Sequence, residues 1–362
     1  ARNYFSCRKK QSFHLVFYIL TNNKNSSPLG MVLTIVISLV FAALFMWLAF
    51  KGLEFDKIKG YFAEANYFWV LAAMVFGLLA YWFRAIRWNL LLEPMGYQIS
   101  NSNSLWTISF GYLMNLTIPR SGELARSTAL YGVEKVPVDK SFGTIILERV
   151  VDLVCMLGFL ALTLVFKYSA ISAFYHQSGI KINPVFVVSA FVFFIIGTFL
   201  FFKFKDKFTH LRFIGKVIEF VEGIFHGLTT IFKLKQKGKF ILLSIAIWVS
   251  YYFAAYLVCF ALPETSHFTF ADGFFVIVVG TLGMMVPASG GIGAFHFAMK
   301  IGIGALFFSY GKTFEEGAAI GLSYAFISHT MQLVIMAVMG VISIPMLAKA
   351  RNEAVKSKVF SE

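Results

Sequence analysis

Long apolar stretches alternate with shorter polar connections along almost the whole chain. Six of these stretches are continuous and approach the roughly 20 residues that a membrane-spanning helix needs. They lie at about 29–50, 67–92, 142–166, 185–202, 240–262 and 318–347. The pattern predicts an all-α fold, a polytopic helical bundle that is integral to a membrane.

Two further apolar segments, at about 103–130 and 270–308, are interrupted by glycines and by one shared signature. The signature is Pro-x-Ser-Gly, and it occurs at 119–122 and at 287–290. Non-helical backbone is tolerated at membrane depth only where protein or a water-filled space satisfies its hydrogen bonds. We therefore expect two broken or re-entrant hairpins, and eight spans rather than six if each hairpin crosses the membrane completely.

The two signatures are separated by three predicted spans, an odd number. The halves that contain them, about 67–166 and 240–347, would then point in opposite directions across the membrane. Inverted repeats with discontinuous helices that meet near the midplane recur among transporters. We therefore hypothesise that a transport site lies between the two breaks.

Composition supports the membrane assignment and changes the meaning of the charge. Hydrophobic residues make up 58% of the 362 residues and charged residues 14%, against roughly 45–50% and 25% in soluble domains. The net charge of +14 does not indicate nucleic-acid binding, because the basic residues lie between apolar segments. The three cysteines lack a C-x-x-C spacing, so neither a disulfide framework nor a metal site is expected.

The basic residues instead indicate topology. Of 32 Lys and Arg residues, 25 fall in the N-terminal segment, the region 84–149, the 203–239 connection or the C-terminal tail. The positive-inside rule puts these regions, and both termini, in the cytoplasm of a cell (inner) membrane protein. We expect a cytoplasmic leader at 1–28, a single membrane domain at 29–347 with a basic amphipathic connection at 203–239, and a cytoplasmic tail at 348–362.

Charged residues in the first break are the strongest candidates for a binding site. Glu123 and Arg126 are three residues apart and could pair on one helical face, which would leave Arg120 free. A planar guanidinium beside backbone N–H groups, such as those that follow Ser121 and Gly122, is a good receptor for phosphate. The alternative is an ion-paired loop with Arg120 extended to the interface.

A second charged cluster lies in the third predicted span. Glu148 and Asp152 share a helical face, whereas Arg149 points about 100° away and could reach another element. Two buried acids need a cationic partner, for which Arg84, Arg120 and Arg126 are candidates. Arg84 and Arg87 are most simply interpreted as an interfacial anchor next to Trp88, with a head-group contact as the alternative.

The second break is rich in glycine and contains histidine nearby. Ser289, Gly290 and Gly291 begin it, and the glycines permit backbone angles and close approaches that other residues do not. His296 and His329 lie in the late apolar segments, where a paired polar role and a merely satisfied core histidine are both open.

Together these motifs resemble the flippase-like membrane domain of the lysylphosphatidylglycerol synthase transmembrane family. The resemblance covers about 29–347 and rests on the following residues: Arg84 to Trp88, Asn115, Pro119 to Glu123, Arg126, Glu148, Arg149, Asp152 and Pro287 to Gly293. It implies a lipid-translocating domain. Many relatives have Glu where this chain has His296 and Arg near the position of His329. We expect no soluble aminoacyl-transferring domain and therefore no lipid synthesis.

The expected function is therefore movement of a phosphate-bearing amphiphile, a phospholipid or polyprenyl phosphate, between leaflets, without enzymatic activity. No cofactor or metal is expected, and the expected partners are lipids with anionic or phosphate head groups. A homo-oligomer and a partner lipid-synthesising enzyme stay open. Two alternatives remain: an intramembrane serine hydrolase that uses Ser289 and His329, and an accessory subunit without transport.

Overall fold

The computed structural model describes residues 28–52, 55–178 and 234–359, and throughout these ranges the regular structure is helical. The α-helices are α2 (Pro28–Phe50), α3 (Phe55–Glu64), α4 (Tyr67–Leu92), α5 (Asn101–Thr117), α6 (Gly122–Glu134), α7 (Val138–Phe166), α8 (Tyr168–Gln177), α11 (Lys237–Cys259), α12 (Phe270–Met284), α13 (Ala294–Ser309) and α14 (Phe314–Val359). Short 3-10 turns occur at η1 (Glu93–Met95), η2 (Pro263–Thr265) and η3 (Ser289–Gly291). The all-α bundle predicted from the sequence is confirmed.

Five segments of the described chain are long and apolar enough to cross a membrane. They are Tyr67–Met95, Val138–Phe166, Lys237–Cys259, Ser289–Ser309 and Phe314–Ala354. The predicted stretches at 67–92, 142–166, 240–262 and 318–347 correspond to α4, α7, α11 and α14, and the stretch at 29–50 corresponds to α2. The predicted leader, the stretch at 185–202 and nearly all of the 203–239 connection lie outside the described residues.

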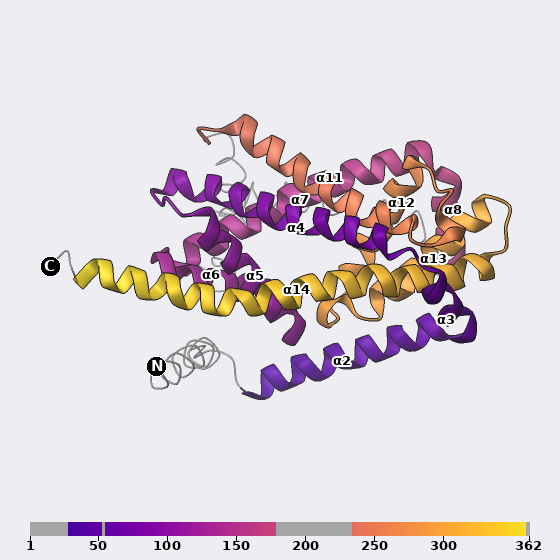
Figure 1. Ribbon diagram of the computed structural model, residues 1–362, viewed down its shortest axis with the longest axis horizontal. Coiled ribbons are helices and arrows are strands. Elements are labelled where there is room, and N and C mark those ends of the chain that lie inside the picture. The colour runs from indigo at the N-terminus through magenta and orange to yellow at the C-terminus, as the bar shows by residue number, and fades with distance from the viewer. Residues whose placement is uncertain (1–27, 53–54, 179–233, 360–362) are drawn as a thin grey trace, which may run out of the picture.

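The long helices run roughly parallel to one axis, and the two hairpins lie at opposite ends of it (Figure 1). The hairpin of α5 and α6 lies at the end where α4 finishes and α7 begins, and the hairpin of α12 and α13 lies at the other end. Helices of 17, 13, 15 and 16 residues form the four arms. At 1.5 Å per residue these arms are each about 20–26 Å long, shorter than the roughly 30 Å hydrocarbon core.

Helix α14 has 46 residues and extends past the predicted 318–347 stretch at both ends. It would measure about 69 Å at 1.5 Å per residue, and its C-terminal part projects beyond the bundle (Figure 1). It packs against both hairpins, through α5 and α6 at one end and through α13 at the other. One continuous helix therefore connects the two breaks.

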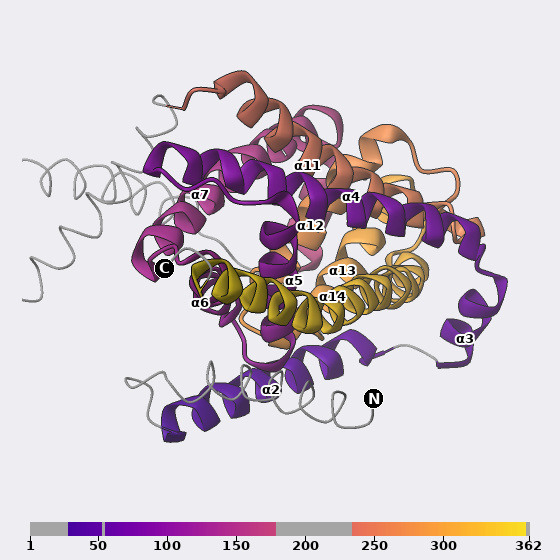
Figure 2. The same cartoon turned by 60° about the vertical axis from the view of Figure 1, so that its left-hand side comes forward.

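Helix α2 lies on the outside of the bundle in both views (Figure 2). Its inner face packs on α13 and on η3 in the second break, whereas Leu39, Val40 and Trp47 on other faces are exposed. Such an exposed apolar surface suits contact with lipid tails. The largest buried cluster lies among α4, α11, α12, α13 and α14 and is dominated by aromatic and branched side chains.

Candidate functional site

The first break is a tight turn between α5 and α6. The Asn115 side-chain oxygen accepts a hydrogen bond from Gly122 N at 2.7 Å, and the Ser121 hydroxyl donates to the carbonyl of Ile118 at 2.8 Å. A methyl group on Gly122 would overlap the Gly111 carbonyl and the Asn115 amide. Only a glycine lets α5 and α6 approach this closely. One of the N–H groups predicted to hold a phosphate is therefore already occupied by Asn115.

Arg120 connects the two breaks. Its backbone is left-handed, with a φ of 58°, a conformation that costs a non-glycine residue about 1–2 kcal/mol. The exposed side chain reaches the second hairpin, where Nη2 donates to the Met285 carbonyl at 3.1 Å. Met285 caps the C-terminus of α12, the negative end of that helix dipole. Arg120 is thus not the partner of the buried acids, contrary to one of the predicted options.

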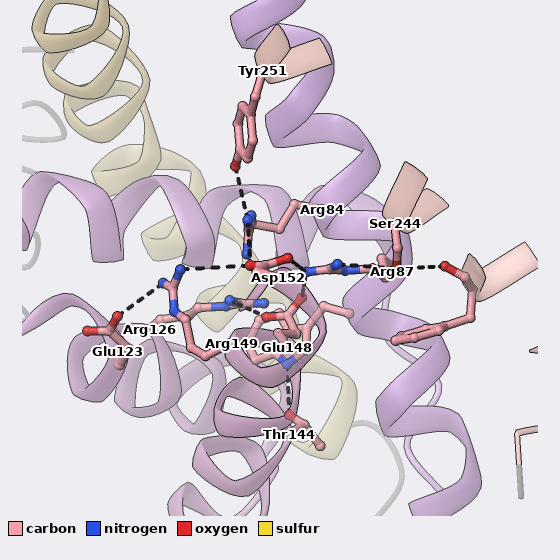
Figure 3. A network of polar contacts seen from close by, with 12 residues as sticks. Arg84, Arg87, Glu123, Arg126, Thr144, Glu148, Arg149, Asp152, Ser244 and Tyr251 are labelled. Atoms are coloured by element: carbon pink, nitrogen blue, oxygen red, sulfur yellow. Dashed lines mark hydrogen bonds and ion pairs between the residues drawn. The ribbon is translucent and has the colours of Figure 1, made fainter. Parts of the chain in front are cut away.

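Behind the first break, α4, α6 and α7 bring together a buried network of charges (Figure 3). Glu148 of α7 accepts from Arg126 Nη1 of α6 at 2.7 Å and lies 3.5 Å from Arg87 Nη2 of α4. Asp152, one turn further along α7, accepts from Arg84 at 3.0 Å and from Arg87 at 2.9 Å. The predicted need of Glu148 and Asp152 for cationic partners is confirmed, with Arg84 and Arg126 among them.

The rim of this network is more open. Arg149 Nη2 donates to Glu123 at 3.0 Å, Arg149 Nη1 lies 3.9 Å from Asp152, and the Arg149 side chain is 43% exposed. The predicted Glu123–Arg126 pair is wrong, because α7 passes close enough to α6 to offer each of these residues a better partner. Arg126 turns inward to Glu148, and Glu123 turns outward to Arg149. The prediction that Arg149 reaches another element is confirmed.

Arg84 and Arg87 are not an interfacial anchor. They are 2% and 0% exposed, and Trp88 beside them is also fully buried. The two arginines lie about 7–12 Å inside the C-terminal end of α4 at 1.5 Å per residue. The anchor interpretation fails because both acids of α7 lie at the same depth and attract the guanidiniums inward.

The guanidinium groups of the network are incompletely satisfied. Five of their nitrogens are buried without a hydrogen-bond partner among the described residues: Arg84 Nε and Nη1, Arg87 Nε, and Arg126 Nε and Nη2. Among the carboxylates of this network, only Glu148 has a buried oxygen without a hydrogen bond, Oε1, which lies 3.5 Å from Arg87 Nη2. Three buried cations face two buried anions, so the centre carries a net charge of about +1 and has more donors than acceptors.

Four contacts of the network had no signal in the sequence. The Arg126 guanidinium stacks 3.5 Å from the centre of the Trp88 ring, whose Nε1 donates to Thr144. From α11, the Tyr251 hydroxyl accepts from Arg84 at 3.0 Å and the Ser244 hydroxyl accepts from Arg87 at 3.3 Å. Tyr251 and Ser244 lie on a helix more than 150 positions from Arg84 and Arg87, beyond the reach of local spacing arguments.

The second break is held by hydroxyl groups and by buried imidazole rings. Gly290, Gly291 and Gly293 all have positive φ angles, of 58°, 77° and 81°, as their glycine-rich sequence predicts. Ser289 N donates to the Ser38 hydroxyl of α2 at 2.8 Å, and the hydroxyls of Ser38 and Ser289 lie 3.1 Å apart. A methyl group on Gly293 would overlap the Ala42 carbonyl of α2. The second break therefore forms part of the surface on which α2 packs.

The histidines predicted near this break lie side by side. The His296 and His329 ring centroids are 5.1 Å apart, and His329 Nε2 is 2.8 Å from the Gly290 carbonyl. Ser289 is bonded to Ser38 and His329 to Gly290, so the hydrogen bonds of the described residues do not form a Ser289–His329 dyad. No group of three or more His, Cys, Asp or Glu residues within the described ranges could hold a metal ion.

Comparison with known proteins places this geometry in a family. The family model described as the lysylphosphatidylglycerol synthase TM region matches residues 35–351. The chain belongs to this family. It is a multi-pass membrane protein of the lysylphosphatidylglycerol synthase TM region family, and the matched range contains both breaks and the whole charged network.

A second comparison is with a more distantly similar membrane protein. The chain is 25% identical over 159 residues to a UPF0104 membrane protein of Methanocaldococcus jannaschii. The match covers 43% of this chain and spans about half (46%) of that protein's length. No solved structure matches the chain.

Proposed function

We propose that this membrane domain moves a phosphate-bearing amphiphile, either a phospholipid or a polyprenyl phosphate, between the two leaflets. The observation that carries the proposal is the surplus of buried, unpartnered guanidinium N–H groups at Arg84, Arg87 and Arg126. Membership of the lysylphosphatidylglycerol synthase TM region family supports a flippase-like role. We propose a transporter and not an enzyme, because the unpaired guanidinium donors of the site suit binding of a ligand.

The charge balance favours an anionic head group. A buried charge costs several kcal/mol unless it is paired and hydrogen-bonded, and a polar donor left unsatisfied costs about 1–3 kcal/mol. A phosphate offers several acceptor oxygens and at least one negative charge, and arginine binds it in a bidentate manner. A phosphate would therefore satisfy the free donors and offset the extra positive charge, which a neutral head group could not do.

The position of the network suggests how a head group reaches it. Arg149 and Glu123 form the exposed side of the network, and Arg120 lies between the first and second breaks. A head group would first replace Glu123 as the partner of Arg149. It would then move to the buried arginines and leave past Arg120. The tails would stay in the surrounding lipid. The sequence has no G-x-x-x-x-G-K-[ST] phosphate-binding loop for ATP, so we propose that a gradient or simple equilibration drives the movement.

We further propose that the chain lies in the cell membrane with both termini in the cytoplasm. Basic residues are concentrated at the end of the bundle where α4 finishes, α7 and α11 begin and α14 projects. The described ones there are Lys135, Lys140, Lys235, Lys237, Lys239, Lys349 and Arg351. The positive-inside rule places this end, and with it the charged network, on the cytoplasmic side. Lipids with anionic head groups, and a lipid-synthesising enzyme that supplies them, are the proposed partners.

A liposome assay tests the proposal. The protein is reconstituted with fluorescent phosphatidylglycerol, a fluorescent polyprenyl phosphate or a phosphate-free glycosylceramide, and exchange of the head group between leaflets is followed by quenching from outside. We expect exchange of at least one phosphorylated lipid and none of the glycosylceramide. Exchange no faster than in protein-free liposomes for all lipids would contradict the proposal.

Arg120 and Lys135 form a matched pair of variants for the same assay. Both are exposed cations with a left-handed backbone, φ 58° and 57°, and they lie at opposite ends of α6. Arg120→Gln should lower the exchange rate at least about tenfold, since loss of a hydrogen bond to a charged group costs about 1.5–3 kcal/mol and each 1.4 kcal/mol is about tenfold. Lys135→Gln should leave it unchanged. Equal rates in the two variants would remove Arg120 from the path.

A further inference from the structure

The histidine pair at the second break is not used by the proposed phosphate site. His296 belongs to α13 and His329 to α14, and their side chains are almost completely buried, with 4% and 1% exposure. Their ring centroids lie 5.1 Å apart, and the Phe295 and Phe326 rings lie against them at 5.0 and 4.4 Å. Two basic groups are thus enclosed by aromatic carbon next to a backbone break.

The hydrogen bonds define the role of one nitrogen in each ring. A carbonyl oxygen only accepts, so His329 Nε2, 2.8 Å from the Gly290 oxygen, must carry a proton. His296 Nδ1 accepts from Gly293 N at 3.4 Å and is therefore unprotonated. His329 Nδ1 is buried and has no hydrogen-bond partner among the described residues. Within the described residues this nitrogen thus has neither a donor to accept from nor an acceptor to donate to.

No charged group pairs with this nitrogen in the described part of the chain. The helices that touch the break or the pair are α2, α3, α5, α12, α13 and α14. The other charged or titratable side chains that the structure describes in these helices or directly next to them are Lys51, Tyr61, Glu64, Tyr112, Asp272, Lys300, Tyr310, Glu315, Glu316, Tyr324, Lys349, Arg351 and Glu353. None of them forms a hydrogen bond or an ion pair with either histidine; Lys300, for example, donates to the carbonyls of Leu48 and Lys51, and Asp272 binds Lys167.

We propose that His329, packed on His296, is a proton-binding site that controls the opening of the second break. A proton from water adds to His329 Nδ1 and forms an N–H bond, which converts the ring to imidazolium; no other bond changes. The inference goes beyond the proposed function, because proton binding here does not depend on which lipid the first break holds.

Protonation should loosen the break for an electrostatic reason. The enclosed structure offers the new Nδ1–H no acceptor and the new charge no counterion, and the neighbouring His296 cannot pair with it favourably. A buried charge in that condition is strongly unfavourable. Water must enter, and the direct route is displacement of α2, which is attached to the break through Ser38 and Ser289. Acid therefore shifts the population from the enclosed state to a hydrated one.

The test measures water access and not transport. The native Cys7, Cys155 and Cys259 are replaced by serine, and a single cysteine is introduced at Ala288, which is 7% exposed and directly precedes Ser289. Its labelling rate with a membrane-impermeant maleimide is divided by the rate for Lys135→Cys, an exposed position, to remove the intrinsic pH dependence of the thiol. The protein is full-length and reconstituted in zwitterionic liposomes.

We expect this ratio to rise at least about fivefold between pH 8 and pH 5.5, the range in which histidine changes its charge. His329→Gln can still donate to Gly290 but cannot bind the proton, so its ratio should not change with pH. His329→Asn serves as a second variant if the glutamine protein is poorly folded. A flat ratio in the parent, or an unchanged pH response in both His329 variants, would overturn the proposal.

His296→Gln separates the two rings. We expect it to keep a pH response, because His329 Nδ1 remains. Loss of the response in His296→Gln together with retention in His329→Gln would overturn the assignment of the proton to His329. No lipid is transported in this assay, so a negative result would not contradict the proposed phosphate site. A negative result in the exchange assay would likewise not contradict the proposed proton site.

Discussion

The two breaks share the Pro-x-Ser-Gly signature but are stabilised by different chemistry. The first is surrounded by seven ionised side chains from α4, α6 and α7, and its turn is locked by Asn115. The second has three glycines with positive φ angles, a serine-serine contact to α2 and a pair of buried imidazoles. The signature sets the interruption of the helix, and its neighbours decide what the interruption can bind.

This difference in chemistry also predicts that the first break is rigid and the second mobile. Removing one partner from a buried ion pair costs about 3–5 kcal/mol, whereas a single neutral hydrogen bond contributes about 0.5–1.5 kcal/mol. The first break should therefore stay fixed while the second opens. The predictions below challenge this contrast, in order of expected effect.

Glu148→Gln should be the most damaging change. It leaves Arg126 and Arg87 without the carboxylate they share at full burial, and we expect a loss of about 3–5 kcal/mol of stability. Glu123→Gln, on the exposed side of the same network, should cost about 1 kcal/mol or less. Thermal unfolding in detergent compares the two, and similar midpoints would mean that the network does not stabilise the first break.

Gly122→Ala should disturb the first break through packing alone. The added methyl group would overlap the Gly111 carbonyl, and overpacking of this kind costs about 1–3 kcal/mol. Gly132→Ala is a matched control in the same helix, since nothing lies within 4 Å of its added methyl group. The control should be neutral or stabilising by up to about 1 kcal/mol. Equal melting of both variants would argue against the close contact of α5 and α6.

Ser38→Ala should have a smaller effect, confined to the second break. It removes the acceptor for Ser289 N and should cost about 1 kcal/mol. In the cysteine-labelling experiment it should raise the access of Ala288→Cys at neutral pH, because α2 is less firmly attached. Unchanged labelling would show that α2 does not control entry of water to this break.

The smallest expected effect is a pH-dependent change in the stability contributed by Lys167, which lies outside the membrane spans. Burial alone would lower the pKa of Lys167, but its hydrogen bonds to Asp272 and Tyr310 raise it above the usual value. A raised lysine pKa gives stability that is complete below the unfolded-state pKa of about 10.4 and is lost as pH rises through the folded-state value. The melting advantage of the parent over Lys167→Met should thus shrink above about pH 10.4, and a constant difference would contradict the ion pair.

The lengths of the apolar stretches and the positions of the glycines predicted much of the fold, but they predicted less of the site. The stretches at 67–92, 142–166 and 240–262 predicted helices well because about 20 apolar residues have few alternatives in a membrane. Spacing placed Glu148 and Asp152 on one face, but it paired Glu123 with Arg126 because it could not foresee how closely α7 passes α6. It also missed Ser38, since a contact between residues 251 positions apart leaves no local pattern.

The central claim, that the buried guanidiniums bind a phosphate head group, is tested most directly by a binding comparison. Native mass spectrometry of the full chain would measure the affinity for a polyprenyl phosphate and for the matching polyprenol. We predict at least about tenfold tighter binding of the phosphate, equivalent to about 1.4 kcal/mol, and loss of that preference in Arg126→Gln but not in Lys135→Gln. Equal affinity of the wild-type protein for the phosphate and the alcohol would contradict the account.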